Sequence, residues 1–152
     1  MPFLAELKHR KPFKPRSDLE RRLEDISIVL DALLPLEIHV STKRKMIDRA
    51  LWRVVEVSGN FSPRYRSEGV LCNLRAKIQR DHVHPRALLV REFLNKQRSA
   101  EDTVKLAFCC LVTDDEHQRL TDIDSKYIGW ARYEQAEVKY QDMLPRPTPD
   151  VA

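Results

Sequence analysis

Apolar residues recur at helical spacing over long stretches of this 152-residue chain, and that spacing limits the folds open to it. From Leu19 to Leu33 they follow at intervals of four, three, four and three, which places them along one face of a helix. The same criterion predicts helices over residues 41–58 and 86–97. We therefore expect a mainly α fold with a small β component, an α+β protein.

Other elements are predicted from capping residues or from short runs rather than from a long apolar face. Residues typical of a capping box begin at Ser17 and again at Thr113, so each is expected to open a helix. Alternation of apolar and polar residues predicts a short strand over 78–84. The apolar run 108–112 fits either the end of a helix or a strand, and residues 64–77 fit either a helix or irregular structure.

Prolines set off both ends of the chain from a single globular domain, which we place at residues 17–142. Residues 1–16 hold three prolines among basic residues and are expected to form an extended basic arm, and residues 143–152 hold three more and are expected to form a loose tail. The expected parts of the domain are a helical part (17–77), a central unit (78–120) and a C-terminal docking segment (121–142).

Composition excludes several classes of protein. The three glycines, Gly59, Gly69 and Gly129, are too far apart to build a glycine-rich phosphate-binding loop. An odd number of cysteines without a Cys-x-x-Cys spacing argues against a disulfide framework or a thiolate zinc site. The adjacent Cys109 and Cys110 lie in an apolar run and are expected to be buried free thiols.

No apolar stretch approaches the roughly 20 residues of a membrane-spanning helix. The N-terminal residues lack the apolar region of a secretory signal. We expect a cytoplasmic protein with no membrane partner.

The chain is basic, with a net charge of +4 and a pI of about 9.0. Several arginines stand near tyrosine or tryptophan in the sequence, a mixture suited to phosphate contacts and base stacking. A nucleic-acid partner is therefore expected, although solvated basic faces of a helical protein remain the alternative. The arginines expected to contact nucleic acid are Arg64, Arg66, Arg80, Arg86 and Arg119.

The segment Asp81-His82-Val83-His84-Pro85-Arg86 carries the chemistry of a hydrolytic metal site. Neutral imidazoles accept protons and ligate metals, and a carboxylate next to them can hold a divalent cation. On a strand, His82 and His84 would point the same way and chelate one metal. A third histidine, His117, would lie one turn inside the helix that begins at Thr113, where the helix dipole favours a neutral imidazole.

This pattern resembles the HNH (ββα-metal) nucleases, whose first strand ends in Asp-His followed by His-Pro and whose second strand leads into a helix with the last histidine. The resemblance covers residues 78–120. It implies that His82 is the general base and that Asp81 and His117, with His84 beside them, hold Mg²⁺, Mn²⁺ or Zn²⁺. The family's Gly-Gly turn, zinc-ribbon cysteines and middle asparagine are missing here, and only Thr113 stands near the asparagine's place.

Three functions follow as hypotheses. The first is a metal-dependent nucleic-acid phosphodiesterase, and the second a nucleic-acid-binding protein without catalysis. The third is a protein-interaction module, such as an inhibitor or antitoxin on a nuclease-like scaffold, with a protein partner or a second copy of the chain.

Overall fold

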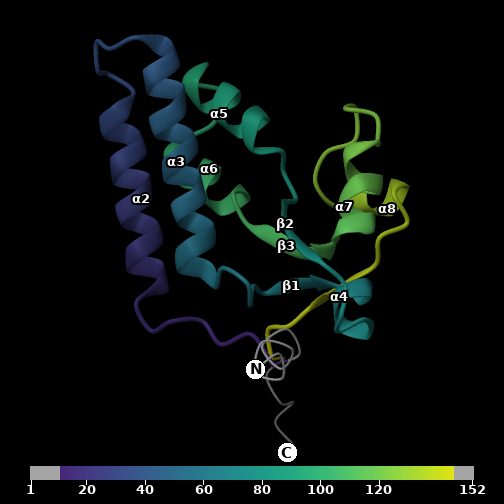
Figure 1. The fold of residues 1–152 in the computed structure, drawn as a ribbon. Helices are drawn as coiled ribbons and strands as arrows, with labels where there is room; N and C mark the ends of the chain where they lie inside the picture. Colours follow the sequence, from purple (N-terminus) through teal and green to yellow (C-terminus); the bar gives the residue numbers. More distant parts are fainter. Residues whose placement is uncertain (1–10, 146–152) are drawn as a thin grey trace, which may run out of the picture.

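The computed structural model describes residues 11–145, and in this range it contains seven helices and four strands (Figure 1). The predicted mainly α class with a small β component is confirmed. The helices are α2 (Leu19–Leu33), α3 (Val40–Ser58), α4 (Glu68–Cys72), α5 (Arg86–Leu94), α6 (Ala100–Leu106), α7 (Asp114–Thr121) and α8 (Trp130–Gln135). The strands are β1 (Tyr65–Ser67), β2 (Ile78–His82), β3 (Cys109–Thr113) and β4 (Tyr140–Asp142).

Four helices pack into one unit around a shared apolar core. Helix α2 packs on α3 and α6, and α5 also packs on α3 and α6, so the α2–α6 and α3–α5 seams lie opposite each other (Figure 1). The stripe predicted for the first helix is confirmed, since Ile26, Leu30 and Leu33 are buried in this core. Removal of these side chains from water drives the assembly of the unit.

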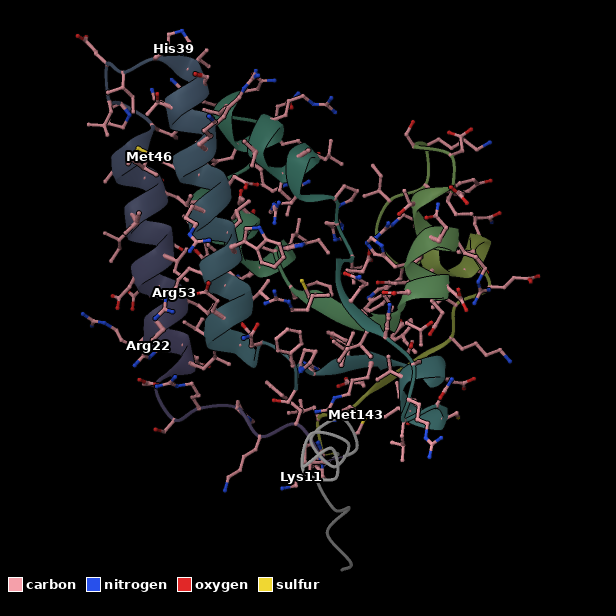
Figure 2. The ribbon with its side chains drawn as sticks, viewed as in Figure 1. Lys11, Arg22, His39, Met46, Arg53 and Met143 are labelled. Atoms are coloured by element: carbon pink, nitrogen blue, oxygen red, sulfur yellow. The ribbon has the colours of Figure 1, made fainter. Side chains whose placement is uncertain are left out.

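The helix ends follow the predicted caps only in part. Asp18, not Ser17, is the N-cap of α2, and it makes no side-chain cap hydrogen bond because its carboxylate pairs with Arg16 and Arg22. The capping box predicted at Ser17 is therefore wrong. His39 caps α3 at the corner between α2 and α3, where its Nδ1 accepts a hydrogen bond from the backbone N–H of Ser41 (Figure 2).

A four-stranded sheet in the order β2-β3-β1-β4 joins the helical unit to the C-terminal helices. Strands β2 and β3 are antiparallel, with Asp81 opposite Cys110 and His82 opposite Cys109. The run 108–112 thus contributes a strand, and α7 follows it directly. The predicted order of strand, strand and helix is present, with α5 and α6 inserted between the two strands.

The second core lies on the sheet face that α7 and α8 cover. It contains Val83, which follows β2, Cys110 and Val112 of β3, Leu120 of α7 and Tyr133 of α8. Burial raises the pKa of the Cys109 thiol to about 12 and also raises that of Cys110, so both behave as the small buried apolar groups expected.

Several segments differ from the sequence-based expectation. Residues 64–77, for which the sequence left a helix or irregular structure open, form β1 and α4, and Leu74 in this segment is 39% exposed. Phe13 of the predicted arm is buried, and its backbone N–H donates to the carbonyl of Met143. The ends of the described range are therefore tied to the domain, whereas the rest of the predicted arm and tail, residues 1–10 and 146–152, lies outside the described residues. None of the helices described is long and apolar enough to cross a bilayer.

Candidate functional site

Strand β2 directs successive side chains to opposite faces of the sheet. The His82 ring faces the helical unit, where its edge meets Trp52 of α3 at a centroid distance of 5.0 Å. The Asp81 carboxylate faces α7 and α8, where it meets Arg132 and Tyr133. The predicted general base and the predicted metal-binding carboxylate are thus separated by the sheet.

Asp81 is a buried carboxylate held by two strong donors. Its Oδ2 accepts hydrogen bonds from the Tyr133 hydroxyl and from Arg132 Nη2, each at 2.5 Å. Burial raises the pKa of Asp81, while the charge of Arg132, the Tyr133 hydrogen bond and His117 act to lower it. Arg132 also donates to the carbonyl of His82 at 2.8 Å, so it joins the end of β2 to α8.

The residues around Asp81 do not fit a metal centre. His117 is near, with Nε2 3.8 Å from Asp81 Oδ1, but the guanidinium of Arg132 occupies the position in front of the carboxylate where a cation would bind. His84 lies elsewhere, with its ring against Gly129. In residues 11–145 no three His, Cys, Asp or Glu side chains group as metal ligands, so the predicted set Asp81, His84 and His117 is not assembled.

His82 is also poorly placed as a general base. Burial, followed by the charges of Arg86, Arg80 and Arg132, lowers its pKa from 6.5 to about 4. A base this weak is mismatched to proton abstraction near neutral pH. Its Nε2 is buried without a hydrogen-bond partner among the described residues. Thr113, the nearest counterpart of the missing asparagine, is engaged by the cap of α7.

The low pKa of His82 predicts a specific pH dependence of stability. Below pH 6.5 the unfolded chain protonates this imidazole, whereas the folded chain resists protonation down to about pH 4. Stability from the buried neutral ring is therefore complete above 6.5 and is lost as the pH falls toward 4. The free energy of unfolding of the wild type, relative to His82→Gln, should fall by on the order of 1–2 kcal/mol between pH 7 and pH 5. Urea titrations at both pH values measure this, and a constant difference would contradict it.

On the helical side of the sheet, arginines and aromatic rings stack in a continuous row. The Arg80 guanidinium lies 4.6 Å from the Phe61 ring centroid and 4.9 Å from that of Trp52. Arg86 lies 4.3 Å from the same Trp52 centroid and pairs with Asp48 of α3. We call Phe61, Arg80, Trp52 and Arg86 the arginine–aromatic row. Such contacts hold guanidinium groups in place while leaving their charge intact.

A basic groove of about 400 Å³ between α3 and α5 adjoins this row. It is lined by Arg44, Lys45, Asp48, Ala87, Val90 and Arg91. Asp48 is already paired with Arg86, and the three other charged residues take part in no ion pair within residues 11–145. The first turn of α3 also lacks an acidic residue, so the positive end of its dipole adds to the field. This seam therefore attracts anions.

The five arginines predicted to contact nucleic acid do not form one surface. Arg80 and Arg86 come together in the arginine–aromatic row. Arg64 forms a two-pronged pair with Asp142 across β1 and β4, at 2.8 and 2.7 Å. Arg119 donates to the carbonyl of Ala136, which places it with the C-terminal helices.

Arg66 cannot contact a nucleic acid, so that prediction is wrong. The residue is fully buried, and its guanidinium donates to the carbonyls of Pro63 and Lys11 at 3.0 and 2.8 Å. Burial lowers its pKa. Arg66 is a structural link between β1 and the N-terminal segment, because Lys11, whose carbonyl accepts from its guanidinium, lies 55 residues away in the sequence.

Two residues central to the site were missed by the sequence reasoning. Arg132 and Tyr133 lie in the segment assigned to docking, and their neighbours in sequence give no sign that they meet Asp81. Trp52 is only partly buried and lies under two guanidinium groups. No protein-family model, curated protein or solved structure matches the chain.

Proposed function

We propose that this protein binds nucleic acid through the α3–α5 seam and does not cleave it. The basic groove and the arginine–aromatic row form one surface, on which five cations outnumber the single carboxylate of Asp48: Arg44, Lys45, Arg80, Arg86 and Arg91. This local excess of charge is the observation that carries the proposal. Polyanions bind such a surface because phosphate contacts release condensed counterions.

The row adds a second mode of contact. Guanidinium groups held over the Trp52 ring are preorganised to donate in pairs to phosphate oxygens. Phe61, which is 45% exposed at the end of the row, offers an aromatic edge to a base. The separation of His82 from Asp81 and His117 favours binding over hydrolysis.

Charge reversal in the groove tests the proposal. We expect Arg44→Glu with Lys45→Glu and Arg91→Glu to weaken binding of a fluorescent oligonucleotide by about tenfold or more at 0.1 M salt. The slope of log K against log[salt] should become shallower by about 2 to 3, since up to three phosphate contacts are lost. Fluorescence anisotropy across a salt series measures both, with single-stranded and duplex probes.

A matched variant distinguishes the loss of this surface from a change in the net charge of the protein. Reversal of three exposed cations elsewhere, Arg75→Glu, Lys126→Glu and Lys139→Glu, changes the net charge equally. It should leave affinity within about twofold, because a surface charge distant from the contact is screened by salt. Equal losses in both triple variants, or affinity that ignores salt, would refute the proposal.

Incubation of the same complexes with Mg²⁺ or Mn²⁺ decides between binding and catalysis. The oligonucleotide should remain intact. Metal-dependent cleavage by the wild type that His82→Ala abolishes would instead establish the nuclease predicted from the motif.

A further inference from the structure

A second groove, of about 600 Å³, lies between α2 and α6 on the seam opposite the basic groove. Its lining is Glu20, Leu23, Glu24, Ser27, Ile28, Asp31, Glu101, Val104 and Lys105. Leu23 and Val104 belong to the core of the helical unit or pack against it, so the floor of the groove is apolar. Ile28 is 57% exposed, so within residues 11–145 a large apolar side chain stands largely in water.

Carboxylates edge this groove along α2. Glu20, Glu24 and Asp31 take part in no ion pair within residues 11–145, and Lys105, the cation of the lining, is already paired with Glu101 at 3.0 Å. Glu20 and Glu24 are four residues apart on one helix face, a spacing at which like charges destabilise a helix. This cluster of negative charge therefore lowers the stability of α2. It also contrasts with the net charge of +4 of the whole protein.

The length of the groove along α2 fits one helix of a partner. From Glu20 to Asp31 the lining face of α2 runs for three turns, about 16 Å. An apolar floor with acidic edges over that length matches a helix with one apolar face flanked by lysines or arginines.

We propose that the α2–α6 groove binds a cationic amphipathic helix of another protein. Apolar side chains of that helix cover Ile28 and Leu23, and its cations pair with Glu20, Glu24 and Asp31. The rest of this basic chain repels such a ligand, so the charge selects this seam. The inference does not depend on nucleic-acid binding, because the two seams are on opposite sides of the helical unit.

The test uses the full chain and a fluorescein-labelled amphipathic helix of leucine and lysine, about 12 residues long. A peptide of the same composition, permuted to remove the apolar face, is the matched ligand control. We expect saturable binding of the amphipathic peptide, with the permuted peptide binding about tenfold more weakly.

Variants locate the contact. Glu20→Lys with Glu24→Lys and Asp31→Lys should weaken peptide binding by about tenfold or more. Reversal of three other exposed acids, Glu37→Lys, Asp122→Lys and Glu134→Lys, should leave it within about twofold. Ile28→Ser should weaken it by about fivefold, because it removes the exposed apolar contact. Circular dichroism checks that each variant is folded.

Three outcomes of the peptide-binding measurements would overturn the proposal. These are no saturable binding of the amphipathic peptide, equal binding of the permuted peptide, and equal loss in both triple variants. Sedimentation of the protein alone tests whether a second copy of the chain occupies the groove instead. A dimer that the α2 triple variant abolishes would identify a second copy of the chain as the partner and likewise overturn it.

Discussion

Replacement of Arg132 by methionine is expected to lower the free energy of unfolding by about 3–5 kcal/mol at pH 7. Methionine keeps most of the length of the side chain but removes the charge that faces Asp81. The carboxylate, 5% exposed, would then retain only the Tyr133 hydroxyl and the more distant His117. An ionised carboxylate without its cation in a buried site is strongly destabilising.

A second substitution should recover much of this loss. In the Arg132→Met background, Asp81→Asn removes the unpaired charge and leaves an oxygen that accepts from Tyr133. Urea unfolding of the two single variants, the double variant and the wild type gives the coupling energy between the two positions. The destabilisation by Arg132→Met should also shrink at acidic pH, because the unpaired carboxyl then takes up a proton in the folded state.

Arg64 provides the matched control. It makes an ion pair of 2.7 Å with Asp142, close in length to the 2.5 Å pair of Arg132 with Asp81, but its two side chains are 41% and 42% exposed. Arg64→Met should therefore cost only about 0.2–1 kcal/mol. If Arg132→Met costs no more than Arg64→Met, the buried pair is not what holds α8 against the end of β2.

The parts of the fold that the sequence predicted correctly depend on local pattern. The stripe from Leu19 to Leu33 and the capping box at Thr113 each need only neighbouring residues. Strand β4 escaped prediction because its side chains are all exposed and its partner is β1, far away in sequence. Its existence is decided by tertiary pairing rather than by local preference.

In the candidate site, too, local pattern predicted some contacts and tertiary contacts decided the others. The sequence correctly brought His117 close to Asp81, since a strand followed by a helix places them together. It did not predict Arg132, 51 residues from Asp81, which takes the place of a cation. The strand predicted over 78–84 already implied that His82 and Asp81 face opposite sides of the sheet, as they do on β2, but the resemblance assigned both residues to one site. Residue types therefore indicated where charge gathers but not which group neutralises it.

Gly69→Ala is the other substitution expected to have a large effect, a loss of about 2–4 kcal/mol. A Cβ at this position would lie 2.0 Å from Glu116 Oε1. That oxygen accepts hydrogen bonds from the backbone N–H and hydroxyl of Thr113 and from the hydroxyl of Ser67. The added methyl must displace the carboxylate from these donors, although alanine is by itself the better helix former in α4.

The sign of the effect should reverse when Glu116 is removed. Glu116→Ala alone is expected to destabilise the protein, because it leaves the donors of Thr113 and Ser67 unpaired in a buried place. In that background Gly69→Ala meets no carboxylate, and its higher helix propensity should make it neutral or stabilising by up to about 1 kcal/mol. Thermal and urea unfolding of the four proteins measure this. If Gly69→Ala costs the same with and without Glu116, the close approach of α4 to the cap of α7 is not what requires glycine there.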